Sequence, residues 1–186
     1  MSYNAHLSKA GMIPARSAAA ATAVVFPIIP ATDQRVTIPF IRVRAGAAGG
    51  NLAVLQTEAV YKFSLKVSGA VLTIAGIPTG LSGRHVVVRH PGGETKATTI
   101  TAQTGEAVTL ADSMPATDGS TLYLIGTVTN PNTALFPLTI TASTILQADC
   151  PGVVIGRELG WPMLLHLANT DGDQKIEGGT VAYIGV

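Results

Sequence analysis

The chain has 186 residues, a formal net charge of +1 and only 12% charged residues, against about 25% in an ordinary soluble domain. Its 12 basic and 11 acidic residues are intermixed, which excludes the concentrated basic patch that nucleic-acid binding requires. A monomer normally uses surface charge to stay soluble and apart from its neighbours. Because charge is scarce and 47% of the residues are apolar, the composition predicts that much of the surface contacts other protein subunits.

The first 30 residues predict an extended N-terminal arm and neither a signal peptide nor a membrane span. The apolar run from Ala18 to Pro30 is interrupted by Pro27 and is too short to cross a bilayer. Its alanines favour one short helical turn, near Arg16 to Ala23. We expect the arm to contact a neighbouring subunit or a protein lattice. The residues expected to make this contact are Ala18, Val24, Val25, Phe26, Ile28 and Ile29.

Most of the remaining chain has the pattern of half-buried strands. Large apolar residues alternate with other residues along Val60 to Val67 and again along Phe136 to Ala142. Turn-forming runs such as Pro91-Gly92-Gly93 separate the segments. The connections are too short for crossover helices, so most strands should be antiparallel. The sequence therefore predicts an all-β fold of eleven or twelve strands.

Two changes in pattern predict an insertion. Residues 69–128 contain short, glycine-bounded strands, enough for a small β-barrel-like domain. Residues 31–68 and 129–186 carry longer strands, in which prolines should lie at edges or bulges. These prolines are Pro39, Pro137 and Pro162. We expect an antiparallel β-sandwich built from both ends of the chain, with the small domain inserted into it.

The residue types that perform catalysis are present but scattered. His85 and His90 are five positions apart, which places them on opposite faces of a strand. Ser82 lies in a Gly-Leu-Ser-Gly run that lacks the spacing of a nucleophile elbow and indicates a turn. Cys150 is the only cysteine, so an internal disulfide is excluded. We predict a protein that is not an enzyme and that needs neither a cofactor nor a metal.

Three features each allow two interpretations. Asp171 and Asp173 could belong to a calcium loop or to a turn stabilised by its own side chains. Arg42 and Arg44 share one strand face, which is either solvated or a stripe that pairs with an acidic partner surface. Trp161, the only tryptophan, is either a core anchor or an interface residue.

The C-terminal stretch resembles a pattern in small virion structural proteins of tailed phages. It runs Gly160-Trp161-Pro162-Met163-Leu164-Leu165-His166-Leu167-Ala168-Asn169, followed by Gly178-Gly179-Thr180-Val181 and Tyr183. Residues 37–46 are similar to the early strand of those proteins. Val86-Val87-Val88-Arg89-His90, with Leu110, Pro115, Gly119 and Gly126, is similar to their inserted β-domain. Met163 replaces the usual leucine, and Asp171-Gly172-Asp173 replaces a turn of small residues.

The resemblance implies a capsid decoration (cement) protein that binds and stabilises the lattice of the major capsid protein. Such a protein is made in the host cytoplasm, resides on the virion and is a homo-oligomer, with a trimer favoured. A tail, baseplate or fibre component and a host-glycan-binding module are the alternatives. A glycan binder usually shows several exposed aromatic residues, whereas this chain has 5% aromatic residues and one tryptophan. A hydrolase on a β-scaffold would need clustered titratable groups.

Overall fold

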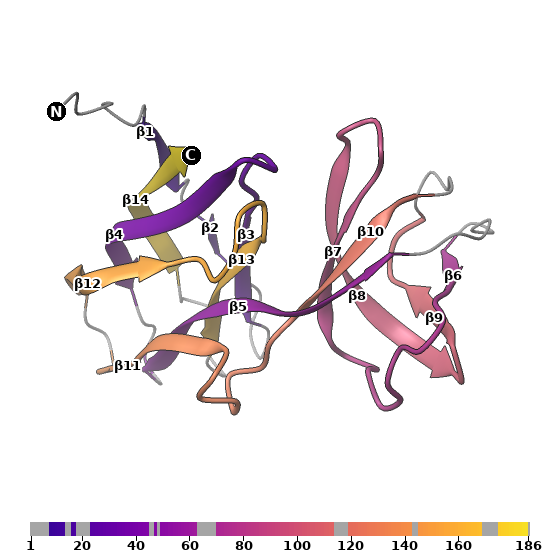
Figure 1. The fold of residues 1–186 in the computed structure, drawn as a ribbon. Helices are drawn as coiled ribbons and strands as arrows, with labels where there is room; N and C mark the ends of the chain where they lie inside the picture. The colour runs from indigo at the N-terminus through magenta and orange to yellow at the C-terminus, as the bar shows by residue number, and fades with distance from the viewer. Residues whose placement is uncertain are drawn as a thin grey trace, which may run out of the picture. The chain divides into compact units, whose positions relative to one another are not determined.

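The computed structural model shows a protein made of strands and turns (Figure 1). It describes residues 8–13, 16–17, 23–44, 47, 49–62, 70–113, 119–142, 145–168 and 175–185. Throughout these residues the structure contains strands and no helix, and the paired strands are antiparallel. The predicted all-β class is therefore confirmed. The chain divides into two compact units, Met1–Gln56 with Val128–Val186, and Thr57–Thr127.

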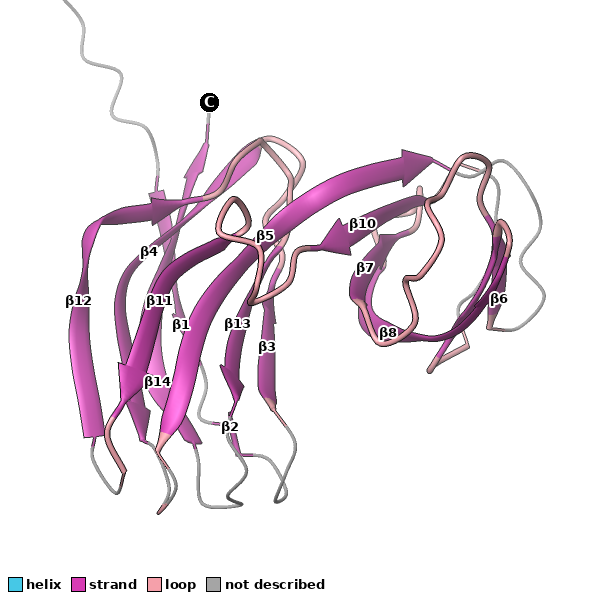
Figure 2. Ribbon diagram, turned by 90° about the horizontal axis from the view of Figure 1, so that it is seen from below, coloured by secondary structure: helices cyan, strands magenta, loops and turns pink. Residues whose placement is uncertain are grey.

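The first unit is an antiparallel sandwich of two sheets, whose layers Figure 2 shows. One sheet has the order β1-β14-β4-β12, with β2 also paired to β14. Its strands are β1 (Ser8–Ile13), β2 (Arg16–Ser17), β4 (Gln34–Arg44), β12 (Ile145–Ile155) and β14 (Lys175–Gly185). The facing strands are β3 (Val24–Ile28), β13 (Met163–Ala168), the first part of β5 (Gly50–Lys62) and β11 (Ala134–Ile140), in that order.

The apolar side chains between these two sheets form the core of the first unit. They belong to strands from both ends of the chain, which are held together by non-local pairing. The buried members are Val24, Ile28, Val36, Ile38, Ile41, Val43, Leu52, Val54, Ile140, Met163, Leu165, Leu167, Ile176 and Val181. Burying each such side chain contributes about 1.5–3 kcal/mol relative to exposure, so this core fixes which face of every strand points inward.

Pro39 occupies a central strand, where a proline would ordinarily interrupt the ladder. Both neighbours of β4 change register beside it: β12 between Asp149 and Val154, and β14 between Thr180 and Ala182. These bulges accommodate a residue that has no N–H to donate. The prediction that Pro39 lies at an edge or bulge is confirmed.

Pro137 also lies at a bulge, as the sequence predicted, whereas Pro162 lies at neither an edge nor a bulge. β11 pairs only with β5 among the described strands, and its register shifts between Leu135 and Leu138, around Pro137. Phe136, inside this bulge, has a φ of 49°, which is rare for an aromatic residue. Pro162 immediately precedes β13.

The second unit has its own strands and its own core. Its strand order is β5-β10-β7-β8-β9-β6, where β5 contributes residues 57–62. The other strands are β6 (Val71–Thr73), β7 (His85–Arg89), β8 (Thr95–Thr104), β9 (Ala107–Leu110) and β10 (Thr121–Ile125). The buried core residues are Leu72, Ile74, Ile77, Leu81, Val86, Val88, Ile100, Val108, Leu110, Leu122 and Leu124. Among the described strands, the two ends of this order, β5 and β6, do not pair with each other. A closed barrel therefore stays a prediction.

The boundary of the second unit differs from the expected insertion of residues 69–128. The unit begins at Thr57, inside β5, because that strand continues from one unit into the other. The alternation predicted for Val60 to Val67 can be followed only to Lys62, since residues 63–69 lie outside the described residues.

The first 30 residues are not an extended arm where they are described. β1 and β2 pair with β14, and β3 pairs with β13. Arg16 and Ser17 therefore form a strand where the alanine content favoured a helical turn. Pairing with distant strands and burial of apolar side chains outweigh local helix propensity here.

Candidate interaction surface

Arg42 and Arg44 lie on the outer face of the five-stranded sheet. Ile41 and Val43 alternate with them along β4 and are buried in the core of the first unit. Because successive residues of a strand point to opposite faces, the two arginines point away from that core, and both are exposed. The structure thus places the two arginines together on one face, as the sequence predicted.

The register defines which positions neighbour these arginines. Arg44 lies opposite Ile145 of β12 and Lys175 of β14, and Arg42 lies opposite Gln147 and Gly178. None of these four partners is acidic. Glu177, however, falls in the bulge of β14 between Ile176 and Gly178, next to Arg42. An exposed arginine fork can bind a carboxylate of a partner in a bidentate manner.

The structure corrects the contact residues expected in the arm. The side chains of Val24 and Ile28 are each 2% exposed and belong to the core of the first unit. They cannot contact a partner without leaving that core, so their prediction as contact residues is wrong. Val25, Phe26 and Ile29 are half-buried, and Phe26 packs against the same core. Ala18 lies outside the described residues.

A pocket of about 330 Å³ lies on the outer side of the other sheet of the first unit. Its lining residues come from β5, β11 and β13 and from Val128, and all are uncharged. They are Asn51, Leu52, Ala53, Val128, Pro137, Leu138, Thr139 and Ala168. The Thr139 hydroxyl donates a hydrogen bond to Asn51 Oδ1 at 3.2 Å, and the Val128 side chain is 50% exposed. The pocket can hold an uncharged group through non-covalent contacts.

Sequence reasoning missed this pocket. Its lining joins segments that are more than 100 residues apart in the chain, and their register brings them together. The exposed Val128 is the one local signal, and a single surface apolar residue is normal in any protein.

The titratable residues of the second unit connect its strands. Arg84 forms an ion pair with Glu58 and donates a hydrogen bond to the Ile125 carbonyl oxygen at 2.7 Å. Burial, and after it the charge of Arg84, lower the pKa of His85 from 6.5. The Nδ1 atom of His85 lies 3.3 Å from the Thr99 hydroxyl oxygen.

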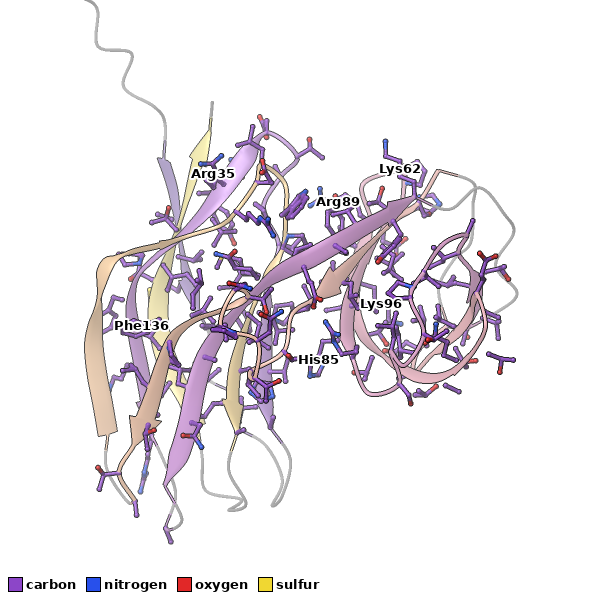
Figure 3. The ribbon with its side chains drawn as sticks, turned by 60° about the horizontal axis from the view of Figure 1, so that its bottom comes forward. Arg35, Lys62, His85, Arg89, Lys96 and Phe136 are labelled. Carbon is purple, nitrogen blue, oxygen red and sulfur yellow. The ribbon has the colours of Figure 1, made fainter. Side chains whose placement is uncertain are left out.

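The neighbouring residues of β7 and β10 make structural contacts of the same kind. Figure 3 labels Arg89 among the side chains of the second unit. Its guanidinium lies 5.3 Å from the ring centre of Tyr123, on the adjacent strand. His90 follows the end of β7, and its Nδ1 accepts a hydrogen bond from the Gly92 N–H at 3.0 Å. These contacts hold strands and a turn in place. In the part of the chain that the structure describes, no three His, Cys, Asp or Glu side chains are grouped so as to hold a metal ion.

The remaining candidates from the sequence lie apart from one another. Ser82 is in a turn, where its hydroxyl donates to the Thr101 carbonyl oxygen at 3.1 Å. Trp161 is half-buried just before β13, and Cys150 lies in β12. Asp171 and Asp173 lie outside the described residues, so both interpretations of them stay open.

Comparison with models of protein families, with curated proteins and with solved structures gave no match in any of the three searches. Among the described residues, no helix has the length and apolar character needed to cross a membrane.

Proposed function

We propose that the protein is a phage capsid decoration protein that binds and stabilises the major-capsid lattice and catalyses no reaction. The observation that carries the proposal is the exposed position of both Arg42 and Arg44 on one face of β4. The low charge content of the chain and its resemblance to small phage virion proteins support the same function.

The two arginines are held on a rigid support. β4 is a central strand with partners on both sides, and the core anchors the residues that alternate with the arginines. An arginine whose backbone is anchored in this way can present its guanidinium to a carboxylate of the lattice. Charged contacts of this kind add specificity and association rate more than affinity. Many modest contacts across a repeated lattice would then give stable attachment of an oligomer through multivalency.

The proposal is tested by co-sedimentation of the purified protein with capsids of the phage that encodes it. The wild-type protein should sediment with the capsids, and a variant combining Arg42→Glu with Arg44→Glu should bind at least tenfold more weakly. Arg157→Glu is the matched control, because Arg157 is exposed and lies in the first unit outside the strands. Each Arg→Glu substitution changes the net charge by the same amount. Absence of wild-type binding would overturn the proposal. Equal binding by the double variant would overturn the assignment of this face.

A further inference from the structure

Arg35 lies near the start of β4, on the same sheet face as Arg42 and Arg44. Val36 and Ile38 are buried in the core of the first unit. Because successive residues of a strand point to opposite faces, Arg35 points away from that core, as the other two arginines do. Both halves of β4 therefore present arginine on the outer face of the five-stranded sheet.

The other half-buried arginines that the structure describes are each held by a partner within the chain. Arg84 pairs with Glu58, and Arg89 lies over the ring of Tyr123. Arg35 is also half-buried, but it forms no hydrogen bond, ion pair or ring contact in the described part of the chain. Its Nε atom is buried without a partner, whereas its two terminal nitrogens are not buried. The guanidinium is thus partly withdrawn from water and keeps accessible donors.

The positions beside Arg35 on this face are uncharged. Ile184 of β14 lies opposite Arg35, and Ala182 lies opposite Thr37, the next residue of β4 on the same face. Thr37 is 6% exposed, and its hydroxyl is also buried without a hydrogen-bond partner. Native proteins contain few buried polar atoms without partners, and here two of them belong to neighbouring residues of one strand face.

Two described carboxylates lie near Arg35 without neutralising it. Asp33 lies two positions before it, and Glu158 lies in the segment 156–160, which hydrogen-bonds to the start of β4. Both are exposed, and neither is within ion-pair distance of Arg35.

The acidic positions on the sheet face itself lie toward the other end of β4. Asp149 is opposite Phe40, and Glu177 is next to Arg42. Both are at least five positions along the strand from Arg35, which corresponds to about 16 Å. A partly desolvated cation without a countercharge is unfavourable in the free protein. A carboxylate from outside the chain would bind its terminal nitrogens through charge-assisted hydrogen bonds.

We propose that Arg35 binds a carboxylate of the major capsid protein and extends the contact surface along β4 beyond Arg42 and Arg44. This inference rests on the proposed function and adds to it a contact residue and the chemistry of its partner. Arg35 differs from the exposed pair because binding removes an unfavourable arrangement that the free protein carries. Its substitution should therefore have opposite effects on stability and on attachment.

Arg35→Met tests the proposal, because methionine keeps an apolar stem and removes the charge. The variant should melt about 1–4 °C higher than the wild type and should bind capsids at least about fivefold more weakly in co-sedimentation. Arg35→Lys restores the charge and should bind more strongly than Arg35→Met. Arg157→Met is the matched control, since Arg157 is exposed and lies outside the strands, and it should change neither Tm nor binding.

The outcomes separate this inference from the proposed function. Absence of wild-type binding to capsids overturns both. Wild-type binding that Arg35→Met leaves unchanged overturns the inference alone, and so does equal loss of binding by the methionine and lysine variants. A lower Tm for Arg35→Met would show that the arginine stabilises the free chain, which contradicts the inference.

A free anion is distinguished by exchanging chloride for phosphate at equal ionic strength. The exchange should shift the Tm of the wild type and of Arg35→Met equally. If phosphate raises the Tm of the wild type alone, the site holds a free anion and the assignment to a capsid carboxylate is overturned.

Discussion

Substitution of Arg44 by glutamate should stabilise the fold while it weakens binding to an acidic partner. In the register, Arg44 lies directly opposite Lys175, and like charges at directly opposite positions of a sheet are unfavourable. Arg44→Glu replaces that arrangement by an opposite-charge pair, and each such cross-strand pair contributes about 0.2–1 kcal/mol. We therefore expect the free energy of unfolding to rise by about 0.5–1 kcal/mol.

The expected rise in stability is measurable. For a chain of this size, 1 kcal/mol corresponds to about 2–4 °C in Tm, so the Arg44→Glu variant should melt about 1–4 °C higher at low salt. The difference should shrink in about 1 M salt, where the Debye length is about 3 Å. Arg157→Glu, an exposed substitution outside the strands, should change stability by less than about 0.5 kcal/mol.

Binding to capsids should change in the opposite direction. The glutamate would repel the carboxylates that the arginine is proposed to contact, so the apparent affinity in co-sedimentation should fall at low salt. Loss of binding together with a higher Tm cannot be explained by unfolding. A lower Tm for Arg44→Glu would refute the register argument. Unchanged binding would show that Arg44 does not contact the capsid.

Three further outcomes follow from the packing. Leu122→Ala empties a fully buried position in the core of the second unit and should cost about 2–5 kcal/mol in chemical denaturation. Gly49→Ala should cost at least about 1 kcal/mol more than Gly83→Ala: both glycines have positive φ, but a Cβ at Gly49 would lie 2.8 Å from a backbone oxygen of β11, whereas one at Gly83 meets nothing within 4 Å. His85 has a folded pKa below 6.5, caused by burial first and then by Arg84. The unfolded chain therefore binds the proton more readily, and stability should fall as pH drops below about 6.5. Denaturation midpoints between pH 7.5 and 5 should show a smaller loss for His85→Asn.

The all-β class and the orientation of the arginines could be predicted because both depend on local periodicity. Alternation of apolar and other residues identifies a strand and its two faces, which is why Arg42 and Arg44 were assigned correctly to one face of β4. Proline positions gave similar information, since Pro39 and Pro137 both lie at bulges.

The features that depend on distant pairing could not be predicted. The start of the second unit falls inside β5, and neither a glycine nor a proline marks the change between Gln56 and Thr57. The expected arm contains only a short apolar segment, and its pairing with β13 joins residues more than 130 positions apart. Nothing local shows that Val24 and Ile28 supply the core. The pocket likewise follows from register and strand order.

The most direct test of the proposed function is the location of the protein on intact virions. Virions of the encoding phage would be labelled with a gold-conjugated antibody against the purified chain and viewed by electron microscopy. The proposal predicts gold distributed over the surface of the head, and an absence of label on particles from a phage that lacks the gene. Label confined to the tail or baseplate, or no specific label on the virion, would contradict it.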